Sequence, residues 1–504
     1  MKYLVKTYIL LLIAVAAASC EGFLEKYPDN GIPMQMTTVQ ETVQVDYGIF
    51  SAFKNGALYS GDMVLCQDLQ ADVAYAFEGF SNTYGPIYRW DIVTTDQNVE
   101  SVYAGLYQVV SRCNFLLDNA GGVLANTTDK NDIETVKKCM GDAHFARALC
   151  FSELIRIYCK AYPVDNEEAA KDLATYPGIS LAVKFGKNNT PLRSSLYDSY
   201  EQVLRDLEKA EEYLKLRSYA ADNPYFTLGA VHALYARVYL HMGKWAKSAE
   251  YATKVIDSKV YKLADATQNN YSAQYNDYRY MWLYDSSPEI IWKISSSYTD
   301  LVGALGIRFL NFDYQSRYQA DYAPSKWVED LYSGSDYRYP AFFMEGTTTY
   351  GTAAVLLRKY AGNPSFDTQA GRYLYTNMPK PLRLSEVYLI RAEASYYAGN
   401  ESTANKDLTT LRRARINGYG TSGASGDGLR KEIRDERVRE LLMEGFRLSD
   451  LKRYGEGFTR KPQNGSYNGP DRLTIKKENA KFVWPIPQHE MDAVPGMQGN
   501  ESNM

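Results

Sequence analysis

Paired amphipathic helices recur along the chain, and they constrain its fold more than any other sequence feature. Residues 228–242 (LGAVHALYARVYLHM) and residues 245–258 repeat apolar positions at helical spacing, and Gly243 and Lys244 leave room only for a tight turn between them. Helix pairs of this kind cannot bury their apolar faces alone, so neighbouring pairs must stack. Further units are expected at residues 384–398 with 402–416, at 102–119 with 132–158, and at 196–216.

The unit at residues 228–258 resembles a tetratricopeptide repeat, with small residues at Ala233, Ala236 and Ala249 and a glycine at its turn. Units of this kind predict a helical-repeat scaffold over about residues 100–260 and 380–455. Two regions interrupt it. Residues 69–96 are rich in Gly, Asp and aromatic side chains, and helical periodicity fades over residues 262–380, where EIIWKI at 289–294 predicts a short strand. We therefore expect a mainly α protein, a tetratricopeptide-like scaffold with long aromatic-rich loops and a few short strands, forming a single domain over residues 20–504.

The first twenty residues predict export. Lys2 and Lys6 precede a short apolar core at residues 8–16, and small residues lead into Cys20. The apolar run is shorter than the roughly 20 residues that span a bilayer, so residues 1–19 are predicted to be a signal peptide. Bacterial lipoproteins are cut and lipidated at a cysteine placed in this way, although Ala17 stands where Leu is commonest. The alternative is an ordinary signal peptide with a chance cysteine. Lipidation of Cys20 predicts a protein anchored by acyl chains.

Composition favours binding over catalysis. The chain has 44 tyrosines and only four histidines. Tyrosine combines a rigid apolar face with a polar tip, which suits recognition surfaces, whereas acid–base and metal chemistry usually relies on histidine. The net charge of −4 and the lack of a basic block give no indication of nucleic-acid binding. The sequence also lacks GxSxG, HExxH, CxxC and phosphate-loop motifs, so we expect no enzymatic activity, no catalytic residue, no cofactor and no metal site.

Acidic residues recur every four positions near the C-terminus, at Glu432, Glu436, Glu440 and Glu444. Stacked like charges destabilise a helix unless cations face them. Guanidinium groups match carboxylates bidentately, so we expect an ion-pair staple between this helix and the preceding repeat. The alternative is a catalytic carboxylate pair across an open cleft, as in a glycosidase. The available cations are Arg383, Arg391, Arg412, Arg415, Arg437 and Arg447.

Four motifs follow one another in the C-terminal third: RLSEVYLIRAEA at residues 383–394, LRRA at 411–414, DERVRELLMEGFRLSDLKR at 435–453 and WPIPQHE at 484–490. Together with the CEGFLE start at Cys20, they resemble the SusD/RagB family of outer-membrane nutrient-binding lipoproteins. The resemblance extends over essentially the whole mature chain. It implies the tetratricopeptide-like fold and a lipid-anchored location on the outer membrane, facing the cell exterior.

The function implied by this resemblance is that of a receptor without enzymatic activity. It would bind a glycan or oligosaccharide and deliver it to a SusC-like TonB-dependent β-barrel transporter, with the tetratricopeptide face as the docking surface for the barrel. A peptide receptor is the alternative within the family. A surface glycoside hydrolase and a purely structural surface subunit are alternatives from other classes.

The family forms its ligand site from two irregular loops, which correspond by position to the loop ending at Trp90 and to residues 297–323. A flat aromatic face can stack on the apolar face of a sugar while a nearby carboxylate binds its hydroxyls. For any one of these aromatic residues, the alternative is a packing role, which for Trp90 means a position in the core. The ligand-binding residues implied in this way are Asp72, Tyr84 and Trp90 from the first loop, and Tyr298, Tyr314, Tyr318 and Tyr322 from the second.

Overall fold

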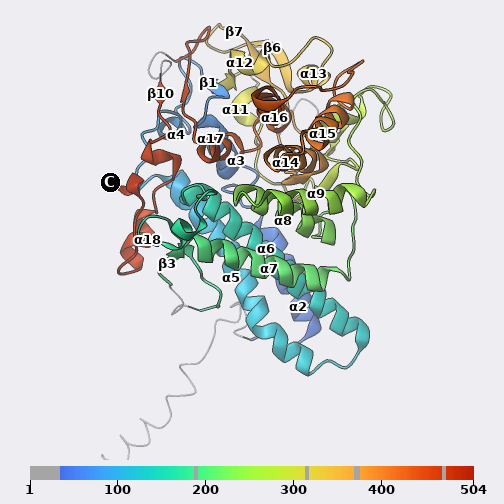
Figure 1. The fold of residues 1–504 in the computed structure, drawn as a ribbon, viewed down its shortest axis with the longest axis vertical. Coiled ribbons are helices and arrows are strands. Elements are labelled where there is room, and N and C mark those ends of the chain that lie inside the picture. Colours follow the sequence, from blue (N-terminus) through green and yellow to red (C-terminus); the bar gives the residue numbers. More distant parts are fainter. Residues whose placement is uncertain (1–34, 187–190, 313–316, 368–374, 468–472) are drawn as a thin grey trace, which may run out of the picture.

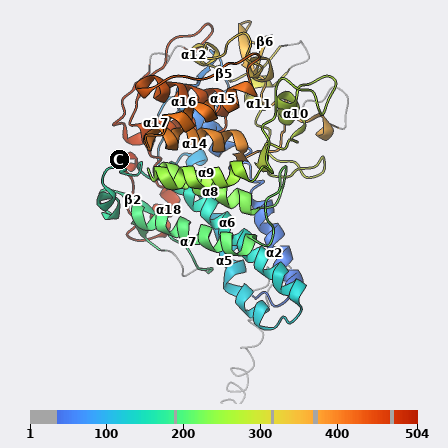
Figure 2. The same cartoon turned by 45° about the vertical axis from the view of Figure 1, so that its right-hand side comes forward.

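The computed structural model describes residues 35–186, 191–312, 317–367, 375–467 and 473–504. Stacked helices form one part of the molecule, and a part with many loops and short strands lies at one end of the stack (Figure 1). A view turned by 45° shows the same division (Figure 2). The mainly α architecture predicted from the sequence is confirmed, including the few short strands.

Seven of the described helices build the scaffold. They pack in the order α5, α6, α7, α8, α9, α14 and α15, each against the next. Helix α14 packs on α9 although the loop-rich residues 262–380 separate the two in sequence. The predicted helices are confirmed, and their ends agree to within three residues except at α5, which begins five residues earlier and ends six residues later than predicted. Their bounds are α5 (Gln97–Ala125), α6 (Lys130–Tyr158), α7 (Leu196–Leu214), α8 (Leu228–His241), α9 (Trp245–Asp257), α14 (Leu384–Tyr397) and α15 (Glu401–Arg413).

Local sequence signals set the ends of these helices. The side chains of Asp96, Ser195 and Thr227 precede α5, α7 and α8, and each accepts a hydrogen bond from a backbone N–H in the first turn. Gly243, between α8 and α9, has a φ of +67°, a conformation that glycine adopts without steric cost. Each helix is therefore specified locally, and the stacking of apolar faces then fixes the order.

The other described helices lie before the scaffold, in the loop-rich part or near the C-terminus. They are α2 (Val39–Ala52), α3 (Asp62–Leu69), α4 (Gly85–Tyr88), α10 (Asp277–Tyr284), α11 (Ile307–Leu310), α12 (Lys326–Glu329), α13 (Arg338–Phe342), α16 (Gly426–Leu441), α17 (Arg447–Tyr454) and α18 (Gln488–Ala493).

Short strands pair only in twos within the described ranges, and every pair is antiparallel. The strand predicted at residues 289–294 is β4, and its partner β8 runs directly into α14, so this pair joins the loop-rich part to the scaffold. The pairs are β1 (Ala74–Ala76) with β5 (Tyr322–Pro324), β2 (Pro177–Ser180) with β3 (Arg193–Ser195), β4 (Ile290–Trp292) with β8 (Leu382–Arg383), β6 (Phe343–Thr347) with β7 (Ala353–Leu357), and β9 (Phe458–Thr459) with β10 (Thr474–Ile475).

The largest hydrophobic core extends from Met36 to Met497 and includes side chains from both parts of the molecule. The cysteines after Cys20 are buried in it or beside it, as predicted for small apolar residues on helices: Cys66, Cys113, Cys139, Cys150 and Cys159. No helix in the described ranges has both the length and the apolar character needed to span a bilayer.

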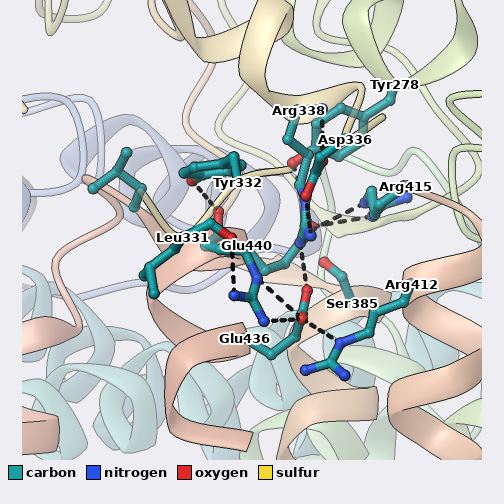
Figure 3. A network of polar contacts seen from close by, with 12 residues as sticks. Tyr278, Leu331, Tyr332, Asp336, Arg338, Ser385, Arg412, Arg415, Glu436 and Glu440 are labelled. Carbon is teal, nitrogen blue, oxygen red and sulfur yellow. Dashed lines mark hydrogen bonds and ion pairs between the residues drawn. The ribbon is translucent and has the colours of Figure 1, made fainter. Parts of the chain in front are cut away.

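An ion-pair network, centred on Glu436 and Glu440 of α16, holds this helix against α13, α15 and the start of α14 (Figure 3). Glu440 lies 3.1 Å from a guanidinium nitrogen of Arg338 and 3.0 Å from those of Arg383 and Arg415. Both glutamates are fully buried. Glu436 binds Arg338 and Arg412, each at 2.6 Å, and Arg439 at 2.7 Å.

The arginines control the charge state of these glutamates. Burial alone would raise the pKa of Glu440, but the guanidinium groups of Arg415, Arg383 and Arg338 lower it well below its usual range. Burial also favours the neutral form of Glu436, but nearby arginines outweigh burial and lower the pKa of Glu436, with Arg338 contributing most. Carboxylates enclosed in this way have no access to a substrate, which argues against the catalytic alternative.

The predicted staple is confirmed in part. Three of the four glutamates lie on α16 and bind arginines, namely Glu432, Glu436 and Glu440. The helix ends at Leu441, so Glu444 lies beyond it, and it binds Arg383 and Lys359. Arg338 was not predicted, because nothing in the local sequence indicates that α13 packs on α16. Three predicted partners bind other carboxylates instead: Arg391 binds Asp407, Arg437 binds Asp450 and Arg447 binds Asp72.

Candidate ligand-binding cleft

The two loops implied by the family resemblance lie side by side. Strand β1 of the first loop pairs with β5 at the end of the second, with Ala74 opposite Pro324. The Ser81 backbone N–H and hydroxyl both donate to the carboxylate of Asp321, at 2.7 and 2.9 Å. Segments about 240 residues apart in sequence are thereby fixed against each other.

A cleft of about 1110 Å³ opens beside this strand pair. Its walls are α12, the β6–β7 hairpin and residues 457–464, and Figure 1 shows α12, β1, β6 and β7 together at the top of the molecule. The cleft exceeds the roughly 300–1,000 Å³ usual for small-ligand sites, so it has room for several linked rings. Its aromatic lining is Tyr75, Tyr88, Trp327 and Phe458, and its polar lining includes Asp72, Lys326, Glu329, Asp330, Glu345, Lys461, Gln463 and Asn464.

Trp327 is held in a single arrangement at this cleft. Its indole N–H donates to the backbone carbonyl oxygen of Asp72 at 2.8 Å. Arg447 donates two hydrogen bonds to the Asp72 carboxylate, at 2.7 and 2.9 Å, and its guanidinium carbon lies 5.4 Å from the Trp327 ring centroid. The half-buried ring therefore needs little ordering when a ligand arrives, which favours binding.

Glu329 differs from the other carboxylates described so far. No arginine lies within ion-pair distance of it in the described structure, and the nearest cation is the Lys326 ammonium at 3.9 Å. Burial raises the pKa of Glu329 to about 7, with Lys326 opposing the shift. Near neutral pH the carboxyl group is therefore present in both forms, and it can donate or accept a hydrogen bond. Burial, together with Glu329, raises the pKa of Tyr75 to about 12, which keeps that hydroxyl neutral.

Only one of the three residues expected from the first loop lines the cleft. Asp72 lines the cleft. Tyr84 is buried instead, and its hydroxyl donates to the carboxylate of Asp62 at 2.8 Å. Burial also raises the pKa of the Tyr84 hydroxyl. Tyr84 is only 9% exposed, so its ring offers no face to a ligand.

Trp90 is the clearest correction to the sequence-based site. Only 5% of it is exposed, and its indole N–H donates to the Gln70 carbonyl oxygen at 2.7 Å. Its ring packs against Phe482, with centroids 4.9 Å apart. A buried tryptophan with its N–H satisfied is a core residue, so the structure favours the core alternative over ligand stacking.

The tyrosines of the second loop also occupy different surroundings. Tyr322, on β5, is fully buried and its hydroxyl donates to the Thr83 carbonyl oxygen at 2.6 Å. Tyr318 is half-buried, with its ring 4.9 Å from that of Phe312. Tyr298 is 63% exposed but does not line the cleft. Tyr314 lies outside the described residues, as do Cys20 and the predicted signal peptide.

Sequence reasoning missed most of the cleft, including Trp327, Glu329, the β6–β7 hairpin and residues 457–464. The aromatic density around Trp327 was a usable signal, since this residue falls in the tyrosine-rich, irregular region of residues 262–380. No pattern marks residues 457–464, which reach the cleft only through the packing of the C-terminal segment. Within the described ranges, no group of His, Cys, Asp and Glu side chains is arranged to hold a metal ion.

Profiles of known families match nearly the whole chain. The profile of the SusD family matches residues 234–502. A second profile, described as "Starch-binding associating with outer membrane", matches residues 22–240.

Individual proteins match at lower identity. A SusD-like protein of Formosa agariphila is 22% identical over 89% of this chain and 89% of its own length. The starch-binding protein SusD of Bacteroides thetaiotaomicron is 33% identical, but over only 25% of this chain and 22% of its own. A solved SusD superfamily structure from Bacteroides thetaiotaomicron superposes with a TM-score of 0.78 at 22% identity, covering 92% of this chain and 100% of that one. A putative sugar binding protein from Bacteroides vulgatus gives 0.77 at 23%, covering 93% and 100%. These structures show that the fold is shared.

Proposed function

Since the chain belongs to the SusD family, we propose that it is a receptor without enzymatic activity that binds a glycan or oligosaccharide in the cleft beside β1 and β5. The observation that carries the proposal is the rigid Trp327 face set among carboxylates and amides in a cleft large enough for several sugar rings. The starch-binding descriptions of a matching profile and of one relative point to the same ligand class.

The chemistry of the cleft suits a sugar chain. Aromatic faces stack on the apolar C–H faces of pyranose rings, and the surrounding polar groups can bind hydroxyls. Asp72 is held by two hydrogen bonds from Arg447, so this carboxylate is not free to act as the nucleophile or base of a glycoside hydrolase. We therefore infer capture without cleavage.

We also propose that acyl chains on Cys20 anchor the protein to the outer membrane, facing the cell exterior. It would pass its ligand to a SusC-like TonB-dependent β-barrel. The stacked helices α5 to α9 are the proposed docking surface, because repeat scaffolds present extended surfaces. The Cys20→Ser variant is expected to move from the membrane fraction to the soluble fraction after a salt wash. A variant that stays membrane-bound would mean that the acyl anchor is wrong or that the transporter alone retains the protein.

The central test compares two half-buried tryptophans. Trp327→Ala is expected to weaken glycan binding by about 2 kcal/mol, roughly thirtyfold, because a central aromatic anchor is lost. Trp245 on α9 stacks on Tyr397 with centroids 4.6 Å apart and lies outside the cleft, so Trp245→Ala is the matched control. Native affinity gels with amylopectin and other plant and microbial polysaccharides identify the ligand, and melting temperatures on the same samples report folding.

The outcomes separate the candidate functions. Retardation of the wild type without release of reducing sugar, and its loss in Trp327→Ala alone, supports the receptor. Release of sugar would indicate a hydrolase. Binding of peptides in calorimetry with no retardation by any polysaccharide would replace the glycan with a peptide. Equal loss of glycan affinity in Trp327→Ala and Trp245→Ala would show that the loss is not specific to the cleft, and it would contradict the cleft as the binding site.

A further inference from the structure

A second pocket lies against helix α2, away from the cleft. Tyr47, Phe50 and Ser51 lie at the spacing that places them on one face of this helix, and Lys54 follows two residues after its end at Ala52. The opposite face is buried, with Asp46, Ile49 and Ala52 packed inward. Phe50 packs on the core through Phe226, with ring centroids 4.7 Å apart, whereas Tyr47 on the same face is exposed to solvent.

This helix face forms one wall of a cavity of about 290 Å³. The facing wall is Pro224 and Tyr225, and Trp292 of β4 lies at the floor. Tyr47 is 55% exposed and Tyr225 is 42% exposed, although both belong to the lining. Two large aromatic side chains therefore border the same small cavity and remain open to solvent.

The walls are rigid. Trp292 donates its indole N–H to the Pro224 carbonyl oxygen at 3.1 Å, which fixes the facing wall to β4. The Arg217 guanidinium carbon lies 5.7 Å from the Tyr225 ring centroid, and the Phe50 ring meets Tyr225 edge to face at 5.4 Å. A ligand that enters need not order these rings, so little affinity is lost to their immobilisation.

The rim supplies both donors and acceptors. Lys54 and Asp300 form an ion pair across the edge of the cavity. The hydroxyls of Ser51 and Ser295 belong to the same lining, and the Tyr47 hydroxyl makes no hydrogen bond within the described residues. The aromatic rings of the lining and the mixed polar groups of the rim match a molecule with an apolar face and a hydroxylated edge.

We propose that this pocket is a second carbohydrate site, which holds one pyranose ring of a longer glycan. A cavity of 290 Å³ is at the small end of ligand sites, so it takes a single ring where the cleft takes several. We expect a single ring in this pocket to bind more weakly than a chain that fills the cleft, because it makes fewer contacts. The inference rests on the proposed function only for its ligand class, because the pocket and its lining are separate from the cleft.

The distance between the pocket and the cleft determines what the pocket would add to binding. Both views place α2 at the opposite end of the molecule from α12 and β6, which border the cleft (Figures 1 and 2). A weak site distant from a stronger one adds avidity for a polymer long enough to reach both. A short oligosaccharide gains nothing, because it occupies one site at a time. The pocket would therefore favour polysaccharide over its short breakdown products.

The test uses methyl glycosides of glucose, galactose, mannose and N-acetylglucosamine as single-ring probes, detected by saturation-transfer NMR. In the Trp327→Ala background, which disables the cleft, Tyr47→Ala is expected to reduce the transferred signal of at least one probe by about threefold to tenfold. Tyr47→Phe keeps the ring and should keep the signal. Tyr271→Ala removes another exposed tyrosine that lies outside the pocket, and it should change nothing.

A signal that survives Trp327→Ala and is lost in Tyr47→Ala supports the second site. A signal unchanged by Tyr47→Ala, or no signal from any probe, overturns it and leaves the cleft to be judged by the gel assay alone. Tyr47 is exposed on a helix, where alanine is well tolerated, so unfolding is not expected to obscure the result. As a second measurement, Tyr47→Ala in the otherwise wild-type chain should weaken retention by long polysaccharide and leave affinity for short oligosaccharides unchanged.

Discussion

Glu440 in the ion-pair network and Glu329 in the cleft are the same residue type in opposite surroundings. Three arginines contact Glu440, and although burial opposes them, they lower its pKa. Glu329 is largely buried with only a lysine at 3.9 Å, and burial raises its pKa to about 7. For these two glutamates, three guanidinium groups in contact outweigh burial and lower the pKa, whereas burial outweighs a single more distant lysine and raises it.

The two glutamates show which carboxylates of this molecule are available to a ligand. A carboxylate whose hydrogen-bonding capacity is filled by arginines fixes the position of a helix and has nothing left to offer a ligand. A carboxylate left incompletely paired at the edge of a cleft is costly for stability but available for recognition. Three substitutions and one change of pH test this contrast, and they are given from the largest expected effect to the smallest.

Glu440→Ala is expected to cause the largest loss, about 3–5 kcal/mol of unfolding free energy, because it leaves three buried guanidinium groups without a shared partner. Urea unfolding measures the loss. Glu478 pairs with Lys477 at 4.0 Å on the surface, so Glu478→Ala is the control and should leave stability unchanged. Loss of glycan binding in Glu440→Ala without loss of stability would contradict the contrast and place the ligand at the network.

Trp90→Ala is expected to cost about 3 kcal/mol, because it opens a cavity against Phe482 and removes the indole hydrogen bond to the Gln70 carbonyl oxygen. Glycan affinity of the folded variant should not change, in contrast to Trp327→Ala. Melting temperature and affinity measured on one sample separate the two effects. A stable Trp90→Ala protein with reduced affinity would restore Trp90 to the binding site.

Acidification should weaken the network. The pKa of Glu440 is lowered in the folded state, so its contribution is complete above its unfolded pKa of about 4.3 and is lost as the pH falls toward the folded value. The loss is about 1.4 kcal/mol for each pH unit in that range. Urea midpoints between pH 6 and pH 3 should therefore fall more steeply for the wild type than for Glu440→Gln. Parallel curves would mean that other groups dominate acid unfolding.

Glu329→Gln is expected to have the smallest effect and the opposite dependence on pH. The folded pKa is raised, so Glu329 favours folding below about pH 4.3, and this contribution is lost as the pH rises through about 7. Only 11% of the side chain is exposed, so its ionised form is poorly solvated, and the variant should be more stable than the wild type by about 1 kcal/mol at pH 8. The difference in stability between variant and wild type should grow from pH 5 to pH 8. A difference that shrinks with rising pH would indicate an unrecognised cation at the cleft.

Local patterns predicted the scaffold well, for physical reasons. Helix pairs such as α8 and α9 are specified by their own periodicity, caps and a turn glycine, all within about thirty residues of sequence. Glu436 and Glu440 were recognised as needing arginines because four-residue spacing is visible in the sequence. Arg338 could not be assigned to them, since its contact depends on how α13 packs on α16.

The cleft was less predictable. The family resemblance, matched by loop position, led to Asp72 and to a site that involves both loops, which the structure places side by side. Loop position could not tell an outward ring from an inward one. Trp90 and Tyr322 point inward and Trp327 borders the cleft, yet all three are large aromatic residues in aromatic-rich segments. Orientation depends on backbone dihedrals and tertiary hydrogen bonds, which composition does not record.

The pairing of β1 with β5 also has a consequence for how the molecule comes into being. The cleft needs residues near 72, near 325 and near 460, so its walls close only after nearly all of the chain is available. Helices α5 to α9 need only neighbours close in sequence, and contacts of that kind form early in folding. During refolding, helical circular dichroism should therefore recover before sugar affinity does. A nascent chain that stops short of residue 457 would have most of its helices and an unfinished binding site.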